Sequence, residues 1–530
     1  MIKKIICVIL VLTLSLLWGC SDVEQNNDDS LPQNSQTAET ASAIQLLYCA
    51  NDTMNPYKTI SKLNAELGLL IFDSLIKYTN EFETVNCLAS KVELDGKTCT
   101  VTLRDAVFSD GSVVSADDIL YSYNLAKESP RFSSLFYEVE SVVTSSSNKV
   151  VFTLACADPY FEKLLTFPII KKDSDKIKNE DNVELAPIGS GRFIFDEKTA
   201  VLTKNIRHYQ KSGSIEKITL INAPDTESMT HYVEIGATDI YFAEMNNDEI
   251  IRMDSKKVSV NRNNLIYLGI NHNYAPLKSD ELRFAISAAI SRTDIVNKAF
   301  YTNATAATGF FHPSFEAVSK YQSINSDADK KISVENLAKI GYNRLNADRY
   351  YENSSGKVIE LTLLVNKDSA SKLSAANLII DRLADSGIKV KLNAVSKSQY
   401  FSLLESGQFQ LYIGEVKLLP NMDMRSLLVS GGSAAYGMIE PPAPSEEAEE
   451  QPEEVAPVFD NETSYLTVLN GFYESKNTIV DLATALQSSM PIIPLVYRNS
   501  LVFYSNEIED VFSPSYNDIF ISIDKYIVKK

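Results

Sequence analysis

Residues that could carry catalysis are sparse and widely spaced in this 530-residue chain. The four histidines lie at least 23 positions apart, so the sequence places no two of them together as metal ligands or as an acid–base pair. There is no Gly-x-Ser-x-Gly nucleophile turn and no His-Glu-x-x-His zinc motif, and Gly96-Lys97-Thr98 lacks the upstream glycine of a phosphate-binding loop. We therefore expect neither catalysis nor a metal or cofactor. The histidines are His208, His231, His272 and His312.

The cysteines favour no single chemistry. Cys7 lies in an apolar N-terminal run, and Cys20 follows that run. The other four could form two disulfide bonds in an exported chain, with three possible pairings, or remain as buried free thiols. They are Cys49, Cys87, Cys99 and Cys156.

Length and charge exclude several classes of function. A hydrophobic content of 45% supports a true core, and a chain of this length is expected to fold as two or three lobes. The net charge of −19 argues against nucleic-acid binding, which requires a basic face, and against docking on anionic lipid by charge.

The N-terminus has the features of a secretory signal. Two lysines precede an apolar run over residues 5–18, and this run of ~14 residues is shorter than the ~20 that span a bilayer. Leu17-Trp18-Gly19-Cys20 resembles a bacterial lipobox, which implies removal of residues 1–19 and lipidation of Cys20. A plain signal peptide with an incidental cysteine, or an uncleaved anchor, is the alternative. Residues 20–43 are polar, so we expect a flexible, lipid-anchored linker there.

Residues 103–123 predict a strand–turn–helix corner. Asp110-Gly111 is a turn dipeptide, because glycine tolerates a positive φ without steric cost. Ser115 can cap the following helix, and Asp117 and Asp118 place negative charge at the positive end of that helix. The geometry of such a corner alone indicates no activity.

The same corner resembles the signature of the family 5 extracellular solute-binding proteins, which are the peptide-, dipeptide- and nickel-binding receptors of ABC importers. Phe108, the Asp-Gly turn, Ala116, Asp118 and Tyr123 stand where that signature has them. The resemblance implies an α/β fold like the type II periplasmic binding proteins. Such a fold has two lobes with mixed sheets, an extra small α+β domain, and a ligand cleft between the lobes.

Later segments extend the resemblance over nearly all of the mature chain. Residues 187–193 resemble Pro-Val/Ile-Gly-Thr-Gly-Pro-Tyr, and we expect the two glycines to let the backbone turn tightly. Residues 271–292 resemble a family helix that contains Arg283 and Arg292, which we interpret as structural. Residues 490–497 resemble the segment where the chain returns to the first lobe.

Between residues 358 and 413, strand and helix patterns alternate. Strands are expected at 358–365, 388–395 and 409–413, with helices at 371–385 and 399–405 between them. This spacing predicts a parallel α/β unit with right-handed crossovers.

One expected ligand contact is altered in this chain. Peptide receptors of the family hold the ligand through backbone hydrogen bonds and bind its amino terminus with an Asp in Gly-Trp-x-x-Asp-Tyr-x-Asp-Pro. The corresponding segment here is residues 414–422, where Leu418 takes the place of that Asp and Glu415 that of the Trp. Glu415 is a candidate substitute, and an ordinary exposed glutamate is the alternative interpretation.

Four further residues are candidates for ligand contact through the resemblance. Asn271 and Tyr274 follow the strand that crosses between the lobes, where the family often places ligand backbone groups. Tyr436 and Gly437 lie in a Gly/Ser-rich loop.

These features together predict a domain organisation. Residues 440–457 contain seven Glu, five Pro and no basic residue, so we expect a disordered surface insert there. The expected segments are signal 1–19, linker 20–43, first lobe 44–76, small α+β domain 77–178, first lobe again 179–265, second lobe 266–489 and a return to the first lobe over 490–530.

The sequence thus favours a monomeric, lipid-anchored receptor of an ABC importer. Its expected partners are a peptide or another small polar solute, a membrane permease pair, and the outer face of the cell membrane through its lipid. A surface receptor that senses peptides for signalling and a cell-surface hydrolase are the alternatives.

Overall fold

The computed structural model describes residues 43–210, 213–246, 251–438, 464–509 and 512–529. The predicted signal peptide, Cys20, nearly all of the linker and the acidic insert lie outside these residues. Within the described residues, no helix is both long enough and apolar enough to span a membrane.

The first lobe contains two small sheets. One has the order β1-β10-β9-β8, with β1 and β10 parallel, and the other is antiparallel with the order β11-β21-β12. Helix α1 (Lys62–Ile71) packs on the first of these sheets, and α3 is Thr226–Glu234. The strands are β1 (Ala43–Tyr48), β8 (Phe193–Asp196), β9 (Val201–Lys204), β10 (Lys217–Asn222), β11 (Ile240–Ala243), β12 (Lys256–Val260) and β21 (Ser500–Tyr504).

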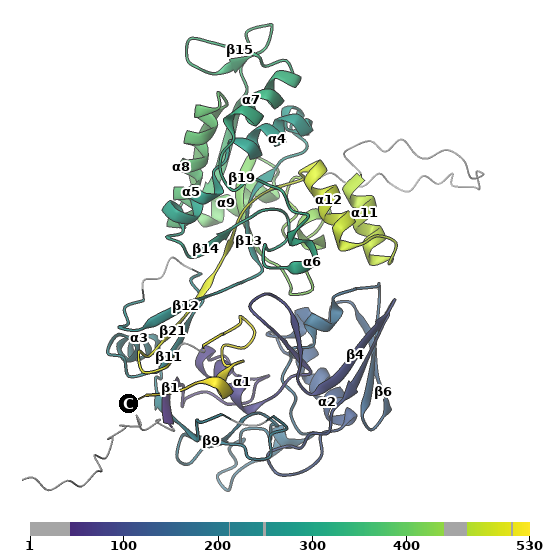
Figure 1. The fold of residues 1–530 in the computed structure, drawn as a ribbon, viewed down its shortest axis with the longest axis vertical. Coiled ribbons are helices and arrows are strands. Elements are labelled where there is room, and N and C mark those ends of the chain that lie inside the picture. Colours follow the sequence, from purple (N-terminus) through teal and green to yellow (C-terminus); the bar gives the residue numbers. More distant parts are fainter. Residues whose placement is uncertain (1–42, 211–212, 247–250, 439–463, 510–511, 530) are drawn as a thin grey trace, which may run out of the picture. The chain divides into compact units, whose positions relative to one another are not determined.

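A small domain interrupts the first lobe. Its antiparallel sheet has the order β4-β5-β7-β6, and helix α2 (Ala116–Glu128) packs against β6 and β7 (Figure 1). Strand β5 alternates between the core and the surface, with Cys99, Val101 and Leu103 facing the core. The strands are β2 (Ile76–Tyr78), β3 (Thr84–Asn86), β4 (Ala89–Asp95), β5 (Thr98–Leu103), β6 (Val139–Ser146) and β7 (Lys149–Leu154).

The second lobe is built on a six-stranded mixed sheet of order β14-β20-β13-β19-β17-β18. Both β18 and β19 pair with β17 in parallel, which confirms the predicted α/β unit. Helices α11 and α12 lie side by side (Figure 1). The strands are β13 (Asn264–Ile270), β14 (Ala304–Ala306), β17 (Glu360–Asn366), β18 (Lys389–Val395), β19 (Leu411–Lys417) and β20 (Ile493–Arg498), and a separate hairpin pairs β15 (Arg344–Leu345) with β16 (Tyr351–Glu352). The helices are α4 (Asp280–Ala289), α5 (Arg292–Asp294), α6 (Glu316–Ser319), α7 (Lys330–Lys339), α8 (Ala370–Asp385), α9 (Lys397–Glu405), α10 (Arg425–Leu428), α11 (Ser464–Tyr473) and α12 (Ile479–Ser489).

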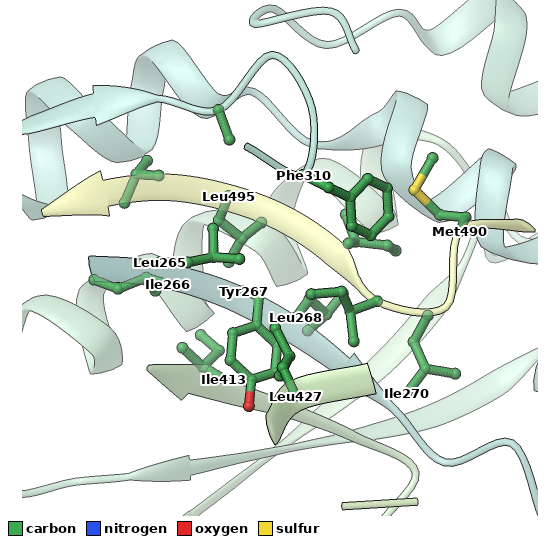
Figure 2. Close-up of a cluster of buried hydrophobic side chains, with 14 of the residues drawn as sticks. Leu265, Ile266, Tyr267, Leu268, Ile270, Phe310, Ile413, Leu427, Met490 and Leu495 are labelled. Atoms are coloured by element: carbon green, nitrogen blue, oxygen red, sulfur yellow. The ribbon is translucent and has the colours of Figure 1, made fainter. Parts of the chain in front are cut away.

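The core of the second lobe lies on both sides of β13, which is buried at every position. Figure 2 shows Leu265, Tyr267 and Leu268 of this strand among apolar side chains from the neighbouring strands and loops. Because β13 is covered on both faces, it reads as a continuous apolar run in the sequence, without alternation.

The described chain passes between the lobes twice. Residues 261–263 connect β12 of the first lobe to β13 of the second, and Asn499 connects β20 back to β21. The two passages are neighbours, because β12 pairs with β21 and β13 pairs with β20. The return to the first lobe therefore follows Arg498, later than the predicted boundary at 490, because β20 completes the sheet of the second lobe.

The capped corner forms as the sequence indicates. Asp118 Oδ2 accepts hydrogen bonds from the Ser115 backbone N–H at 2.9 Å and from its hydroxyl at 2.6 Å, which closes the first turn of α2. Gly111 adopts a φ of +90° in the turn, and its N–H donates to Phe108. After Pro159 the chain forms a short 3-10 turn over Phe161–Leu164.

Gly189 and Gly191 have a different role from the predicted tight turn. Neither adopts a positive φ. They pack against the end of α1, where the Gly191 N–H donates to Ile71 O at 2.9 Å. An added Cβ would lie 2.1 Å from Ile71 O at Gly189 and 2.5 Å from Leu70 O at Gly191, so only glycine permits this approach.

The two arginines of the family-like helix segment are structural, as expected. Arg283 donates to the carbonyl groups of Leu277 and Ser489, at 2.9 Å and 2.8 Å. Arg292 donates to Pro494 O at 2.8 Å, to Asn325 O at 3.1 Å, and to the hydroxyl and carbonyl of Ser287. Both side chains are fully buried, so they satisfy carbonyl groups that water cannot reach.

Replacing Arg292 by Met should destabilise the second lobe strongly. The apolar side chain keeps much of the volume but leaves several buried acceptors without a donor, at a cost of about 3 kcal/mol or more in the free energy of unfolding. Urea denaturation measures this loss. Lys331→Met, at a side chain that is 85% exposed, is the control and should change stability by less than about 0.5 kcal/mol. Equal stability of both variants would contradict the structural role.

Candidate ligand-binding cleft

A cavity of about 980 Å³ lies between the two lobes and the small domain, and we call it the central cleft. Many of its walls are aromatic or aliphatic, with charged groups set among them. The main lining residues are Pro56, Lys62, Ala65, Glu66, Leu69, Phe242, Glu244 and Tyr516 of the first lobe, Arg262 of the crossing segment, Arg131, Phe132, Leu135, Tyr137 and Glu138 of the small domain, and Lys417, Leu418, Leu419, Pro420, Asp423, Arg425 and Ser433 of the second lobe.

Helix α1 supplies one wall of the central cleft. Lys62, Glu66 and Leu69 follow one another at spacings of four and three residues, so they share one face of the helix. Leu63, Leu67 and Leu70 are buried in the lobe beneath. The Ser61 hydroxyl caps α1 by accepting from the Asn64 N–H at 3.3 Å.

Glu66, in the α1 wall of the central cleft, has a raised pKa. Its Oε1 is buried, and Lys62 Nζ lies 3.7 Å from it. Burial raises the pKa of Glu66 to about 7, and the negative charge of Glu244 acts in the same direction, against the positive charges of Lys62 and Arg131. A carboxyl group that titrates near neutral pH in a cavity wall is a candidate for ligand contact.

Glu244, on the same wall, behaves differently. Burial alone would raise its pKa, but a hydrogen bond from Asn246 and the charges of Arg262, Lys62 and Lys417 outweigh burial and lower the pKa. Its side chain is therefore held as a carboxylate with partners of its own.

Tyr516 lies between two cations at the same end of the central cleft. The guanidinium carbon of Arg262 is 5.1 Å from the centre of the Tyr516 ring, and Lys417 Nζ is 5.0 Å from it. Arg262 belongs to the crossing segment and also donates to Glu244 O at 2.6 Å. This end of the central cleft is thus tied to the passage between the lobes.

Opposite sides of the central cleft are joined by a cross-lobe cluster of Tyr137, Glu138, Asp423 and Arg425. The Arg425 guanidinium pairs with Glu138 of the small domain at 3.0 Å and with Asp423 of its own lobe at 2.8 Å. It also donates to the Tyr137 hydroxyl at 2.8 Å, and that hydroxyl is hydrogen-bonded to Asp423. These contacts connect the small domain with the second lobe.

The structure places Glu415 away from the central cleft. Its carboxylate pairs with Lys372 at 2.5 Å and with Arg498 at 3.0 Å, and accepts from the Asn264 side chain at 2.8 Å. Burial would raise its pKa, but the two cations lower it to about 2. Internal bases therefore balance this charge, next to the chain passage at Asn499, and a ligand-binding role for Glu415 stays a prediction.

The other four candidates lie at the far end of β13 or beside it. Asn271 and Tyr274 line a second hollow of about 510 Å³, and the Asn271 amide donates to Phe409 O at 2.8 Å. Gly437 O accepts from the His272 N–H at 2.9 Å, and the Tyr436 ring packs edge-on against Tyr412. Among the described residues that line the central cleft, none of the five predicted contact residues is found. Their roles remain predictions.

The segment 414–422, which contains Glu415, nevertheless reaches the central cleft through Leu418 and Leu419. Leu418 lines the wall and is only 5% exposed, and its N–H donates to Asn263 O at 2.8 Å. The Asn263 side chain donates to Leu419 O at 2.9 Å. The segment is thus fixed to the chain passage at residues 261–263.

Sequence reasoning missed the polar residues of the first-lobe wall. Lys62, Glu66, Glu244 and Tyr516 come from distant parts of the chain, and no local spacing marks them. The available signal was the i, i+4 spacing of Lys62 and Glu66, which places both on one face of α1. In the described residues, the structure shows no group of three or more His, Cys, Asp or Glu side chains that could hold a metal, and the four cysteines are free thiols.

Replacing Glu66 by Gln should stabilise the protein at alkaline pH. The folded carboxyl group has a raised pKa, so wild-type protein loses stability as pH rises from about 4.5 through 7, whereas the amide does not titrate. We expect the variant to gain about 1–3 kcal/mol over wild type at pH 8, with the difference shrinking toward zero near pH 4.5. Urea denaturation at several pH values measures this difference in the free energy of unfolding.

The matched control is Glu335→Gln. Lys331 and Glu335 form a similar i, i+4 pair on α7, at 3.9 Å, but Glu335 is exposed. This variant should follow the pH profile of wild type. A Glu66→Gln profile parallel to that of wild type would show that Glu66 has no raised pKa.

Comparison with known proteins agrees with this architecture. The chain matches the model of the bacterial extracellular solute-binding proteins, family 5 Middle, over residues 83–436. It is 22% identical over 470 residues to the nickel-binding periplasmic protein of Escherichia coli (strain K12), covering 83% of this chain and 86% of that protein. It is 23% identical over 424 residues to the oligopeptide-binding protein AppA of Bacillus subtilis (strain 168), covering 74% and 76%. It is also 24% identical over 466 residues to the glutathione-binding protein GsiB of Salmonella typhi, covering 83% and 82%.

Solved structures share the fold. The nickel ABC transporter from Bacillus halodurans superposes with a TM-score of 0.71 at 15% identity, over 92% of this chain and all of that one. The periplasmic murein tripeptide-binding protein MppA, in its unliganded open form, gives a TM-score of 0.69 at 18% identity, over 93% and 98% of the two chains. The predicted fold, that of a type II periplasmic binding protein, is therefore confirmed. The chain belongs to the bacterial extracellular solute-binding proteins of family 5.

Proposed function

We propose that this protein is the extracytoplasmic solute receptor of an ABC importer, held at the outer face of the cell membrane by a lipid on Cys20. It captures a peptide or a similar small polar solute in the central cleft and delivers it to a membrane permease. The observation that carries this proposal is a cavity of about 980 Å³ walled by both lobes. Relatives with the same family signature are named for binding oligopeptides, glutathione or nickel.

The two adjacent chain passages support closure as the mechanism. In the described part of the chain, the lobes are joined at residues 261–263 and at Asn499, so they can rotate about that edge. Ligand contacts to both lobes then favour the closed form. The cross-lobe cluster adds a polar contact that forms only when the small domain and the second lobe approach each other. Affinity then depends on how much better the solute fits the closed form than the open form.

Filling the central cleft should abolish binding. Ala65 on α1 lines the cavity, so Ala65→Trp places an indole where the solute would lie. With a pool of short peptides at 100 times the dissociation constant, wild-type protein should gain about 2.7 kcal/mol in stability, and the variant should gain almost none. Thermal unfolding measures both, and small-angle scattering should show compaction of wild type alone.

Ala338→Trp controls for the added side chain, since Ala338 is exposed on α7, outside the central cleft. It should respond to peptide as wild type does. If Ala65→Trp also keeps the full response, the solute binds elsewhere. If wild-type protein responds to no peptide, native mass spectrometry of protein purified from its own host will identify the solute that co-purifies, and a co-purifying non-peptide would replace the peptide assignment.

The lipid anchor has its own test. Cys20→Ser removes the sulfur that would carry the lipid, so we expect the variant to lose metabolic labelling by fatty acid and to leave the membrane fraction. Unchanged labelling and fractionation would contradict lipidation at Cys20.

A further inference from the structure

The β2–β3 hairpin of the small domain carries an aromatic side chain into the core of the second lobe. Its strands pair antiparallel, and residues 79–83 form the loop between them. Phe82 of this loop is 3% exposed and lies in the same hydrophobic cluster as β13, with its ring centre 5.0 Å from that of His312. Tyr78 and Phe82 are the buried members of this cluster, among the described residues, that precede the crossing segment 261–263.

The same loop is bound to the crossing segment by hydrogen bonds. Asn80 Oδ1 accepts from the Asn261 N–H at 2.8 Å, and the Asn80 carbonyl accepts from the Asn261 side-chain amide at 2.8 Å. That amide also donates to Ser314 Oγ of the second lobe at 3.0 Å. Phe82 follows Asn80 by two residues, so its ring enters the second lobe beside the passage about which the lobes can rotate.

The small domain holds the loop from its other side. Lys163 Nζ donates to Phe82 O at 2.6 Å and to Thr84 Oγ1 at 3.2 Å, and the Phe82 N–H donates to Thr79 O at 3.0 Å. The backbone of Phe82 has a φ of +62°, which residues with a large side chain rarely adopt. Such a conformation persists only where the surroundings fix it, and here the hairpin fixes the backbone while the second lobe buries the ring.

Polar contacts across the same boundary can part more easily. Asp158 of the small domain accepts from the Asn421 side chain at 2.7 Å, and water can solvate both groups once they separate. The same holds for the pair of Glu138 and Arg425. Withdrawal of Phe82, in contrast, would expose a whole aromatic ring and leave a void in the second-lobe core. The contact that costs most to break therefore lies next to the chain passage, where a rotation displaces groups least.

We infer that Phe82 is the pivot of the lobe movement: its ring stays in the second-lobe core while the lobes rotate, and it restricts that rotation to the axis through the chain passages. Phe82 is thus a positioning residue, which keeps the opposing walls of the central cleft aligned as they approach and separate. The inference rests on the lobe closure of the proposed function, but it does not depend on which solute is bound.

Tyr160 is a second aromatic ring at this boundary and presents the competing possibility. Its ring centre lies 5.2 Å from that of Phe315 and 6.4 Å from that of Phe472. Tyr160 is half-buried, whereas Phe82 is fully buried and lies two residues from the contact between Asn80 and the crossing segment. This difference favours Phe82 as the pivot and makes Tyr160 its matched control.

The test measures the spread of distances between the lobes without any solute. Spin labels are attached to a keto-bearing amino acid at positions 198 and 331, which are exposed in the first and second lobes, so the native cysteines stay unmodified. Pulsed EPR then gives the distance distribution between the two labels. We expect Phe82→Ala to make this distribution about twofold wider than in wild-type protein, because the lobes can then also twist and tilt.

Two further variants separate a pivot from a general loss of packing. Tyr160→Ala also removes a ring from the boundary and should lower stability in urea, but it should leave the width of the distribution unchanged. Phe82→Leu keeps an apolar side chain in the second-lobe core, so it should fold readily and widen the distribution less than Phe82→Ala does.

The outcomes keep this inference apart from the proposed function. If Phe82→Ala and Phe82→Leu both keep the wild-type width, or if Tyr160→Ala widens the distribution as much as Phe82→Ala, Phe82 is not the pivot, and solute capture still stands. A peptide pool added afterwards tests the proposed function alone. If it does not shift the mean distance in wild-type protein, closure around peptides fails, while the comparison of widths is unaffected.

Discussion

The arrangement of the whole molecule depends on two short passages of chain that lie side by side. Because β12 pairs with β21 and β13 pairs with β20, the connections at residues 261–263 and at Asn499 are held at one edge. Hydrogen bonds from Asn261 to Asn80, from Asn263 to Leu419 and from Asn499 to Asn303 attach that edge to its surroundings. We therefore expect relative motion of the lobes to be a rotation about this edge, which would change the distance between the cavity walls.

Three groups of charged side chains lie at the chain passage, across the central cleft, and in the wall of the first lobe. At the passage, the charge of Glu415 is balanced by Lys372 and Arg498. Across the cavity, Arg425 joins the small domain to the second lobe. In the wall of the first lobe, Glu66 has Lys62 as its nearest cation, at 3.7 Å, and burial raises the pKa of this carboxyl group.

Sequence patterns predicted the structural features that depend on residues close together in the chain. The cap formed by Ser115 and Asp118, and the parallel unit from β17 to β19, follow from local spacing, and the structure confirms both. The lining of the cavity could not be predicted in this way, since its residues come from segments hundreds of positions apart. Glu415 illustrates the difference: it stands where a family position suggested ligand contact, but a partner 83 positions away in the sequence engages it.

The two glycines that press against the end of α1 have a further consequence. They fix the helix by leaving no room between it and the residue 189–191 backbone, so the axis of α1 cannot shift when side chains on its outer face are exchanged. We therefore expect exchanges of cleft-facing side chains on α1 to reshape the wall of the central cleft without displacing the helix itself.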